Sequence, residues 1–510
     1  MLLIVDLIYR FTSLGNVFLL LPLLFLLHYL MVLYEFRNMP PGPRFTALPV
    51  LGNIFSLKFR ADKLSDRFRS LRQNYGGVSS LRIGSHKLVM ASTPEAVKEI
   101  LVTRSADFAG RQRTYSLKER TLGCKDIVFG TGPAWKFYRK LFTTALRQYI
   151  TDILLIENRV MTQAEKLVQF MEEQQGRHFD PADCLQRSVA DVICGITFHE
   201  GSDTTNPDIN RLLKLNVHRF SSTKDYQLVV LLDFFHFAKY LPLKVYDRVH
   251  QNCYEIFNII RKLMTERNKS FDPTEPVGDF MSALLRARSD FRTECVSDEE
   301  RAALLSDDYF VSCMEDTFVG GYETTSTALR WIMSFLAQHP QYQMDMQNQM
   351  DEAVGDRRPS LNDRPNLPLV QAAILEALRL GNVVPLAVPH VAVTDTILCG
   401  YRVPKDTIVF ADTESVHLDP KCWEDPTLFN PYRYIDADGE LMTNQGNFYP
   451  FGAGRRVCAG ESLAKIELFL FVALLVHNFT FIAGEGHPPK AKASITQFPT
   501  SYTIRVIPRR

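Results

Sequence analysis

The stretch PFGAGRRVCAGESLAKIELFLF, Pro450 to Phe471, constrains the fold more than any other part of the chain. One cysteine, Cys458, lies between glycine-containing tripeptides, and an apolar helical pattern begins directly after it. The positive end of such a helix and its free amide N–H groups stabilise a thiolate without neutralising it. Three roles for Cys458 are therefore compared: a small core residue, a nucleophile and a metal ligand.

The residues around Cys458 decide between these roles. Gly454 and Gly460 let the backbone approach a ligand where a Cβ would collide. Arg456 can reach a carboxylate on the same ligand, and Phe451 can shield the sulfur from water. The pattern F-x-x-G-x-R-x-C-x-G has the spacing that a haem-thiolate loop requires. The sequence thus favours a ligand of haem iron over a buried structural cysteine.

A second pattern, FVGGYETTSTALRW, joins adjacent glycines to an acid and a hydroxyl. Gly320 and Gly321 would each cost about 1 kcal/mol in a helix interior, which makes sense if a flat cofactor lies against the helix. Glu323 and Thr324 follow at once and can deliver protons to bound dioxygen. The alternative is a kinked structural helix with polar residues on its wet face.

Together these residues resemble the cytochrome P450 monooxygenases of the animal microsomal type. The runs RRPSLNDRPNLPLVQAAILEALR and VVPLAVPH look like the steroid 17α-hydroxylase and aryl hydrocarbon hydroxylase families, and the resemblance covers essentially the whole chain. It implies a mainly α fold with a smaller β portion and a haem b (iron protoporphyrin IX) cofactor. It also implies that Cys458 binds the iron and that Thr324 and Glu323 manage protons on the distal side.

The resemblance gives a structural role to the motif ILEALR. In that family its glutamate and arginine, here Glu376 and Arg379, form a buried pair that a downstream arginine after a proline completes. Arg433 in FNPYRYID takes that position. Tyr432 and Tyr434 depart from the Glu and Phe that are usual there.

Four residues are expected to hold the haem propionates. Trp135 and Arg139 lie at i and i+4 in WKFYRK, so an indole N–H and a guanidinium can both donate from one helix face. His390, at the end of VVPLAVPH, matches a position where family members carry Arg or His. Arg456 is the fourth.

The N-terminus predicts a membrane anchor. From Phe11 to Tyr34 the chain has no Asp, Glu, Lys or Arg, and as a helix this run would span about 36 Å against a bilayer core of roughly 30 Å. We expect an anchor over residues 1–36, a proline-rich hinge over 37–52 and a catalytic domain over 53–510. The flanking charges weakly favour a cytosolic catalytic domain on the endoplasmic reticulum membrane.

Composition bounds the partners. The formal net charge is +1, which gives no reason to expect nucleic acid. Nine cysteines without a CxxC pair fit a reducing compartment. No nucleotide-binding fingerprint appears, so the resemblance implies a separate NADPH–cytochrome P450 reductase, with cytochrome b5 as a further candidate donor. A basic face would suit an acidic flavoprotein, although ordinary solvated side chains explain it as well; its residues are Lys136, Lys140, Arg147 and Arg455.

The expected substrate is a lipophilic, steroid-like or planar aromatic molecule, because the segments around the site are rich in Phe, Leu and Val. Two other functions stay open. A haem-thiolate isomerase or dehydratase would rearrange a hydroperoxide and need neither reductase nor the Glu323–Thr324 pair. A non-catalytic haem-binding protein would have no need for proton delivery.

Periodicity predicts a helix-dominated body. A β-hairpin is expected over 77–92 and further strands over 391–412, with a strand-rich tail. Long helices are expected over 62–75, 308–338, 340–354, 366–380 and 460–478.

Overall fold

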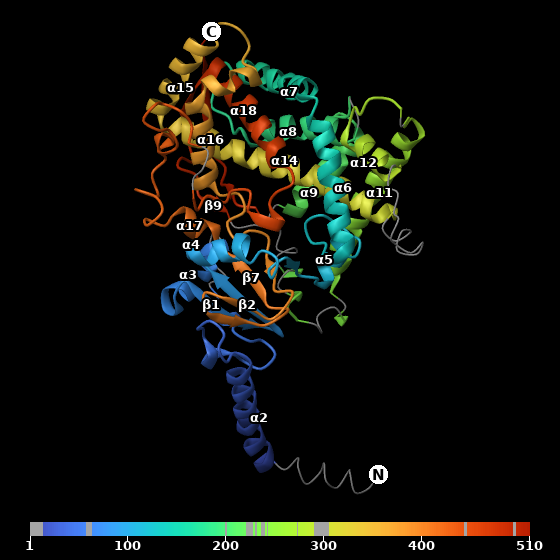
Figure 1. Cartoon of the computed structure of the whole chain (residues 1–510), viewed down its shortest axis with the longest axis vertical. Helices are drawn as coiled ribbons and strands as arrows, with labels where there is room; N and C mark the ends of the chain where they lie inside the picture. The colour runs from blue at the N-terminus through green and yellow to red at the C-terminus, as the bar shows by residue number, and fades with distance from the viewer. Residues whose placement is uncertain are drawn as a thin grey trace.

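The computed structural model describes the chain apart from residues 1–13, 58–63, 199–200, 221–227, 230–231, 236–239, 242, 273, 290–304, 443–445, 493–495 and 510. The architecture is mainly helical, as the sequence predicts (Figure 1). The α-helices are α2 (Leu14–Glu35), α3 (Leu64–Tyr75), α4 (Pro94–Lys98), α5 (Tyr115–Arg120), α6 (Gly132–Ile150), α7 (Ile153–Glu173), α8 (Ala182–Thr197), α9 (Pro207–Phe220), α11 (Lys244–Lys269), α12 (Phe280–Ser289), α14 (Asp307–Gln338), α15 (Pro340–Ala353), α16 (Pro368–Gly381), α17 (Thr413–His417) and α18 (Glu461–Asn478).

The strands form one mixed sheet and three two-stranded sheets. The five-stranded sheet has the order β1-β2-β7-β4-β3, and only the β2–β7 pair in it is parallel. The smaller sheets pair β8 with β11, β9 with β10 and β5 with β6. The strands are β1 (Val78–Ile83), β2 (His86–Ala91), β3 (Gly110–Arg111), β4 (His390–Val391), β5 (Thr396–Leu398), β6 (Tyr401–Val403), β7 (Ile408–Ala411), β8 (Phe479–Ala483), β9 (Ala491–Lys492), β10 (Phe498–Pro499) and β11 (Ile504–Pro508).

Helix α14 is the centre of the helical body. It packs against α8, α11, α15, α16 and α18, and most of its residues are buried. Its apolar residues join those of α6, α7, α8 and α18 in the largest hydrophobic core. The hairpin β1–β2 lies at the opposite end of the body, near α2 (Figure 1).

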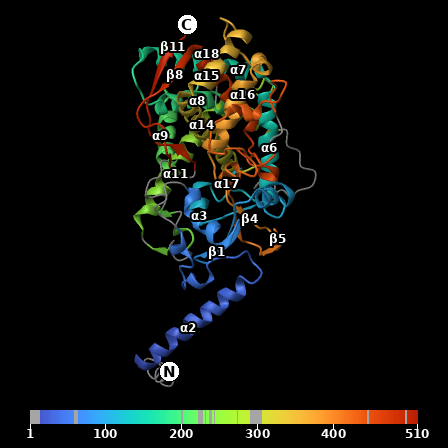
Figure 2. The same ribbon diagram turned by 90° about the vertical axis from the view of Figure 1, so that its left-hand side faces the viewer.

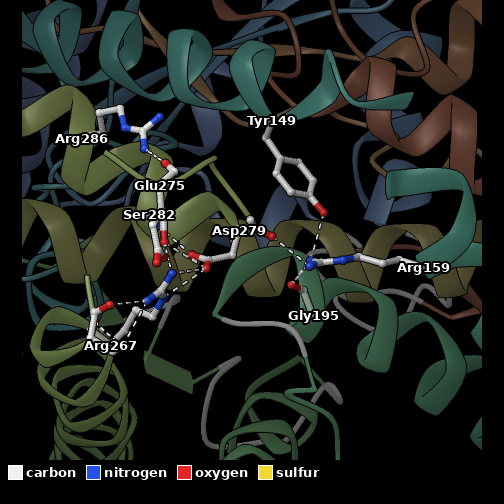
Figure 3. A network of polar contacts seen from close by, with 10 residues as sticks. Tyr149, Arg159, Gly195, Arg267, Glu275, Asp279, Ser282 and Arg286 are labelled. Atoms are coloured by element: carbon white, nitrogen blue, oxygen red, sulfur yellow. Dashed lines mark hydrogen bonds and ion pairs between the residues drawn. The ribbon is translucent and has the colours of Figure 1, made fainter. Parts of the chain in front are cut away.

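Polar contacts join the outer helices to one another (Figure 3). Arg159 of α7 donates to the Tyr149 hydroxyl at 3.1 Å, to the Gly278 carbonyl at 2.8 Å and to the Gly195 carbonyl. Nearby, Arg267 of α11 pairs with Asp279 at 3.1 Å. These bonds fix α6, α7 and α8 around the central helix.

Helix α2 projects away from the body in both views (Figures 1 and 2). Its leucines 23, 24, 26, 27 and 30 are exposed, whereas Val32 and Phe36 are buried in a second core with strands of the main sheet. The expected anchor begins in residues 1–13, outside the described part of the chain. Within the described part, no helix reaches the length and apolarity needed to cross a bilayer.

The proline-rich hinge is held against the main sheet. The carbonyl of Pro41 accepts from the Ser80 amide at 2.8 Å, and the carbonyl of Pro40 accepts from the Ser80 hydroxyl at 2.5 Å. A Cβ at Gly42 would lie 1.7 Å from the Ser80 carbonyl oxygen, so only glycine permits this approach. These contacts hold residues 40–42, which follow α2, against strand β1.

Candidate functional site

The Cys458 loop runs from the short helical turn η7 (Gly454–Arg456) to the start of α18. The Cys458 amide donates to the Phe451 carbonyl at 2.9 Å, which closes the loop. The thiol is accessible although protein atoms surround it. Cys458 therefore lines an interior space and is not a core residue.

Opposing effects act on the pKa of the Cys458 thiol. Burial raises the pKa of Cys458, while the backbone N–H groups of Gly460 and Glu461 and the charge of Arg139 lower it. The amide groups at the start of α18 are thus directed at the sulfur, as the sequence predicts. This arrangement suits a thiolate that receives its remaining stabilisation from a metal ion.

One face of α14 also opens onto space. From Val311 to Ala328 the helix is buried except at Asp316, Gly320, Gly321 and Thr324. Positions 316, 320 and 324 are spaced by four residues and share one face. A Cβ at Gly320 would have no atom within 4 Å, so a flat group can lie against this helix.

The four glycines assigned to the cofactor divide into two pairs. Gly320 and Gly460 face open space, as expected. A Cβ at Gly321 would instead lie 2.5 Å from Ile193 Cδ1 of α8, so this glycine serves helix packing. At Gly454, φ is +65° and a Cβ would lie 1.9 Å from the Leu101 carbonyl oxygen; the close approach there is to the protein's own backbone.

Arg456 lies at the centre of a group of cations. It donates to the Ala109 carbonyl at 2.7 Å and to the Gly130 carbonyl at 2.8 Å, while its buried Nη1 has no partner among the described residues. Its guanidinium carbon lies 3.5 Å from the centroid of the Trp135 ring. Burial, followed by the charge of Arg139, lowers the pKa of Arg456 to about 10.

The indole of Trp135 differs from the prediction. Its N–H donates to the Ile127 carbonyl at 2.9 Å instead of being left for a ligand. The ring supports the Arg456 guanidinium. Arg139, one turn further along α6, donates to the Val457 carbonyl beside the cysteine.

Arg111 adds a further cation to this group, and the ring of His390 lies beside it on the neighbouring strand. They are register partners in β3 and β4. Burial and the charge of Arg111 hold the pKa of His390 well below its usual range, so the ring is neutral. Its Nδ1 lies 2.7 Å from the Phe108 carbonyl oxygen and donates to it. Sequence reasoning missed Arg111, which is buried and whose pKa is also lowered well below its usual range, by burial and by Arg456.

Glu323 and Thr324 do not bond to each other. Glu323 is buried, and its carboxylate accepts from the Thr496 hydroxyl at 3.2 Å. Burial raises the pKa of Glu323, against the opposing effects of Thr496 and Arg330. The Thr324 hydroxyl donates to the Gly320 carbonyl at 2.6 Å on the open face of α14. Thr496 is a partner that sequence reasoning missed.

The three residues assigned to a structural network lie together. Both carboxylate oxygens of Glu376 pair with Arg379 at 2.8 Å, and one also pairs with Arg433 at 2.9 Å. Glu376 and Arg379 are fully buried. Arg379 further donates to backbone carbonyls of His417 and Pro426 at 2.6 and 2.7 Å.

The comparisons with known proteins identify the family. The family model for cytochrome P450 matches residues 40–505. This chain is a member of the cytochrome P450 family. It is therefore a monooxygenase, and members of this family bind haem b through a cysteine thiolate.

Its relatives cover most of the chain. The chain is 34% identical to steroid 17-alpha-hydroxylase/17,20 lyase of Oryzias latipes over 478 residues, 92% of each chain. It is 32% identical to cytochrome P450 2B2 of Rattus norvegicus over 92% of this chain and 93% of the relative. Against cytochrome P450 1A1 of Sparus aurata the identity is 35%, over 88% and 86% of the two chains.

The residues around the site fit haem b. An accessible thiol faces interior space, and Gly320 and Gly460 leave room for a flat ring. Arg456 has an unpartnered buried N–H donor, which suits a ligand that carries carboxylates.

Proposed function

We propose that this P450 hydroxylates a lipophilic small molecule, steroid-like or planar aromatic, with O2 and with electrons from NADPH delivered by a separate reductase. The observation that carries the proposal is the accessible Cys458 thiol, with the amides of Gly460 and Glu461 directed at it. Haem b, when bound, supplies O2 activation at an iron to which the thiolate gives electron density.

In this proposal Cys458 binds the iron and the cation group binds the propionates. Arg139, Arg456 and His390 take that role, and Arg111 joins them because it lies within the same group of charges. Since Nδ1–H of His390 is committed to the Phe108 carbonyl, a carboxylate at Nε2 would be bound only by the protonated ring. Propionate binding should therefore raise the pKa of His390.

Uncharged residues are assigned to contact and support the haem ring. Gly320 of α14 and Gly460 beside the cysteine form the two open walls. Phe451 shields the sulfur, and Trp135 holds the guanidinium of Arg456 in place through its ring face. Gly321 and Gly454 would not contact the haem themselves. They allow the close packing that positions α14 and the Cys458 loop.

Proton delivery is assigned to Glu323 and Thr324. The raised pKa of Glu323 lets it hold a proton at higher pH than an exposed glutamate, and the Thr496 hydroxyl orients its carboxylate. The Thr324 oxygen keeps acceptor capacity on the open helix face while its hydrogen bonds to Gly320. In this proposal Glu323 holds the proton, and Thr324 presents an acceptor on the open face of α14.

The substrate class and the cellular location of the protein are inferred from the relatives and from helix α2. The relative named steroid 17-alpha-hydroxylase/17,20 lyase supports a steroid-like, apolar substrate. The exposed leucines of α2 support an anchor in the endoplasmic reticulum membrane, where such a substrate partitions. The substrate is expected to enter in part through residues 216–240, and residues 221–227, 230–231 and 236–239 of this segment lie outside the described part of the chain.

Electron delivery is assigned to the basic face near the cysteine. Lys136, Lys140 and Arg147 of α6 are exposed, as is Arg455 of η7. This face has the charge that an acidic flavoprotein or cytochrome b5 would require.

Reconstitution with NADPH–cytochrome P450 reductase tests the proposal. We expect a progestogen or a polycyclic aromatic hydrocarbon to gain one O2-derived oxygen, and only when NADPH and reductase are both present. Rearrangement of a lipid hydroperoxide without NADPH would favour the isomerase or dehydratase alternative. Haem binding without product from either substrate type would favour a non-catalytic protein.

A further inference from the structure

A cavity of about 610 Å³ lies at the start of α15 and beside the short helix η6 (Pro431–Tyr434). Helix α15 is at the upper edge of Figure 1. None of the residues that line the cavity is assigned to the haem. Arg433 belongs to the Glu376 network, and backbone atoms of Glu424, Leu428 and Asn430 bond to that network. The lining residues are His339, Gln341, Tyr342, Glu424, Asp425, Leu428, Phe429, Asn430, Tyr432 and Arg433.

Four aromatic rings form a continuous wall of this cavity. Phe429 is buried, with its ring centroid 5.1 Å from His339 and 6.0 Å from Tyr342. Tyr342 in turn lies 6.0 Å from Tyr432, which is 46% exposed. Phe429 is held from behind by Phe335, stacked at 5.0 Å and 7°. Phe429 is therefore packed in the interior, whereas Tyr432 reaches the protein surface.

The ring of His339 is held in place by one hydrogen bond. Its Nδ1 lies 2.8 Å from the Phe335 carbonyl oxygen and donates to it. A ring fixed in this way presents its π face beside Tyr342 and Phe429. Aromatic faces of this kind attract cations, most strongly where water is partly excluded.

The rim of the cavity adds negative charge. Glu424 and Asp425 are exposed, and neither forms an ion pair within the described part of the chain. Arg433 is the sole Lys or Arg among the described lining residues, and its guanidinium is engaged by Glu376 at 2.9 Å and by the Glu424 carbonyl at 3.0 Å. A carboxylate of Asp345 also accepts from the Tyr432 hydroxyl at 2.9 Å.

We propose that this cavity binds a small organic cation, such as a quaternary ammonium compound, between the aromatic wall and the acidic rim. The cavity volume is that of a small-molecule site, larger than one inserted lysine side chain requires. Rings and carboxylates both favour a cation over an anion or a neutral apolar molecule. The cavity adjoins the Glu376 network and contains none of the residues assigned to the haem.

Calorimetric titration of the haem-loaded protein tests this site with two isosteric probes, choline and neutral 3,3-dimethylbutan-1-ol. We expect choline to bind about tenfold more tightly, because only the charged probe is attracted by the ring faces and the carboxylates. The Soret band should stay unchanged throughout. Equal affinity for the two probes, or no binding of choline, would overturn the proposal.

Two variants locate the binding. The exposed double variant Glu424→Gln/Asp425→Asn removes the rim charge without touching the core, and Tyr342→Leu removes one ring. Each should weaken choline binding about fivefold, while the exposed controls Asp438→Asn and Tyr401→Leu should leave it unchanged. Unaltered binding in the site variants, or a Soret shift on adding choline, would place the cation elsewhere and contradict the site.

Discussion

Two arginine-rich regions of this P450 differ in the groups that pair with their guanidiniums. In the network of Glu376, Arg379 and Arg433, one buried carboxylate meets two guanidiniums, and backbone carbonyls accept from the remaining N–H groups. In the cation group around Arg456, burial and neighbouring arginines lower the pKa values of Arg111 and Arg456, with Asp126 opposing, and a buried N–H of Arg456 lacks a partner among the described residues. The first region is complete within the chain, and we propose that an anionic ligand completes the second.

The largest effect is expected from breaking the complete network. Glu376→Gln leaves two guanidiniums without their carboxylate in a region from which water is excluded, so the free energy of unfolding should fall by about 3–5 kcal/mol. Urea unfolding followed by circular dichroism measures this loss. The exposed control Glu440→Gln should change stability little; an equally small loss in Glu376→Gln would show that the network is dispensable.

Glu467 of α18 extends the comparison to a buried carboxyl that pairs with no cation among the described residues. Neither oxygen has a hydrogen-bond partner among the described residues, and burial raises its pKa to about 8. Between about pH 4.5 and 8 the folded protein holds this proton and the unfolded chain does not, so stability should fall as pH rises, by about 1.4 kcal/mol per pH unit at most.

Glu467→Gln removes this titration and should flatten the fall in stability between pH 6 and 8. Thermal unfolding of both proteins across that range measures the difference. Parallel pH profiles would mean that Glu467 is ionised in the folded protein.

Arg139→Gln tests the region that the proposed ligand completes. The substitution removes one of several mutually repelling cations, so the free energy of unfolding should change by no more than about 1 kcal/mol. Haem transfer to apomyoglobin should become about tenfold faster, because a propionate loses a charged donor. A large loss of stability with unchanged haem transfer would reverse the assignment.

Thr324→Ala should have the smallest effect on the fold and a selective effect on turnover. The hydroxyl bonds only to its own helix in this structure, yet its loss should make NADPH oxidation yield several-fold more peroxide per product. Thr317→Ala is the matched control, because Thr317 makes the same bond to Cys313 at 2.7 Å and is buried. Equal coupling in the two variants would remove Thr324 from proton delivery.

The sequence predicted what local patterns encode. Spacing alone placed the helix over 308–338, and α14 spans Asp307–Gln338. Spacing also predicted the Cys458 loop before α18, whereas the family resemblance supplied the two arginine partners of Glu376. The helix and the loop depend on periodicity or on residues that adjoin in the chain.

The direction in which a helix position faces, and contacts between residues far apart in the chain, could not be predicted in the same way. Adjacent glycines do not reveal that Gly320 faces space while Gly321 faces Ile193, because neighbouring Cα–Cβ vectors on a helix diverge by about 100°. Arg111 meets His390 through a two-residue strand pair that no local pattern marks. Thr496 reaches Glu323 from the strand-rich tail.

The most direct test of the central claim, that Cys458 is the axial ligand of haem iron, is the difference spectrum of the dithionite-reduced protein treated with carbon monoxide. We expect the strongly red-shifted Soret band of a thiolate opposite carbon monoxide, and its loss in Cys458→Ser. The same red-shifted band in Cys458→Ser, or a wild-type protein that binds no haem, would contradict the assignment.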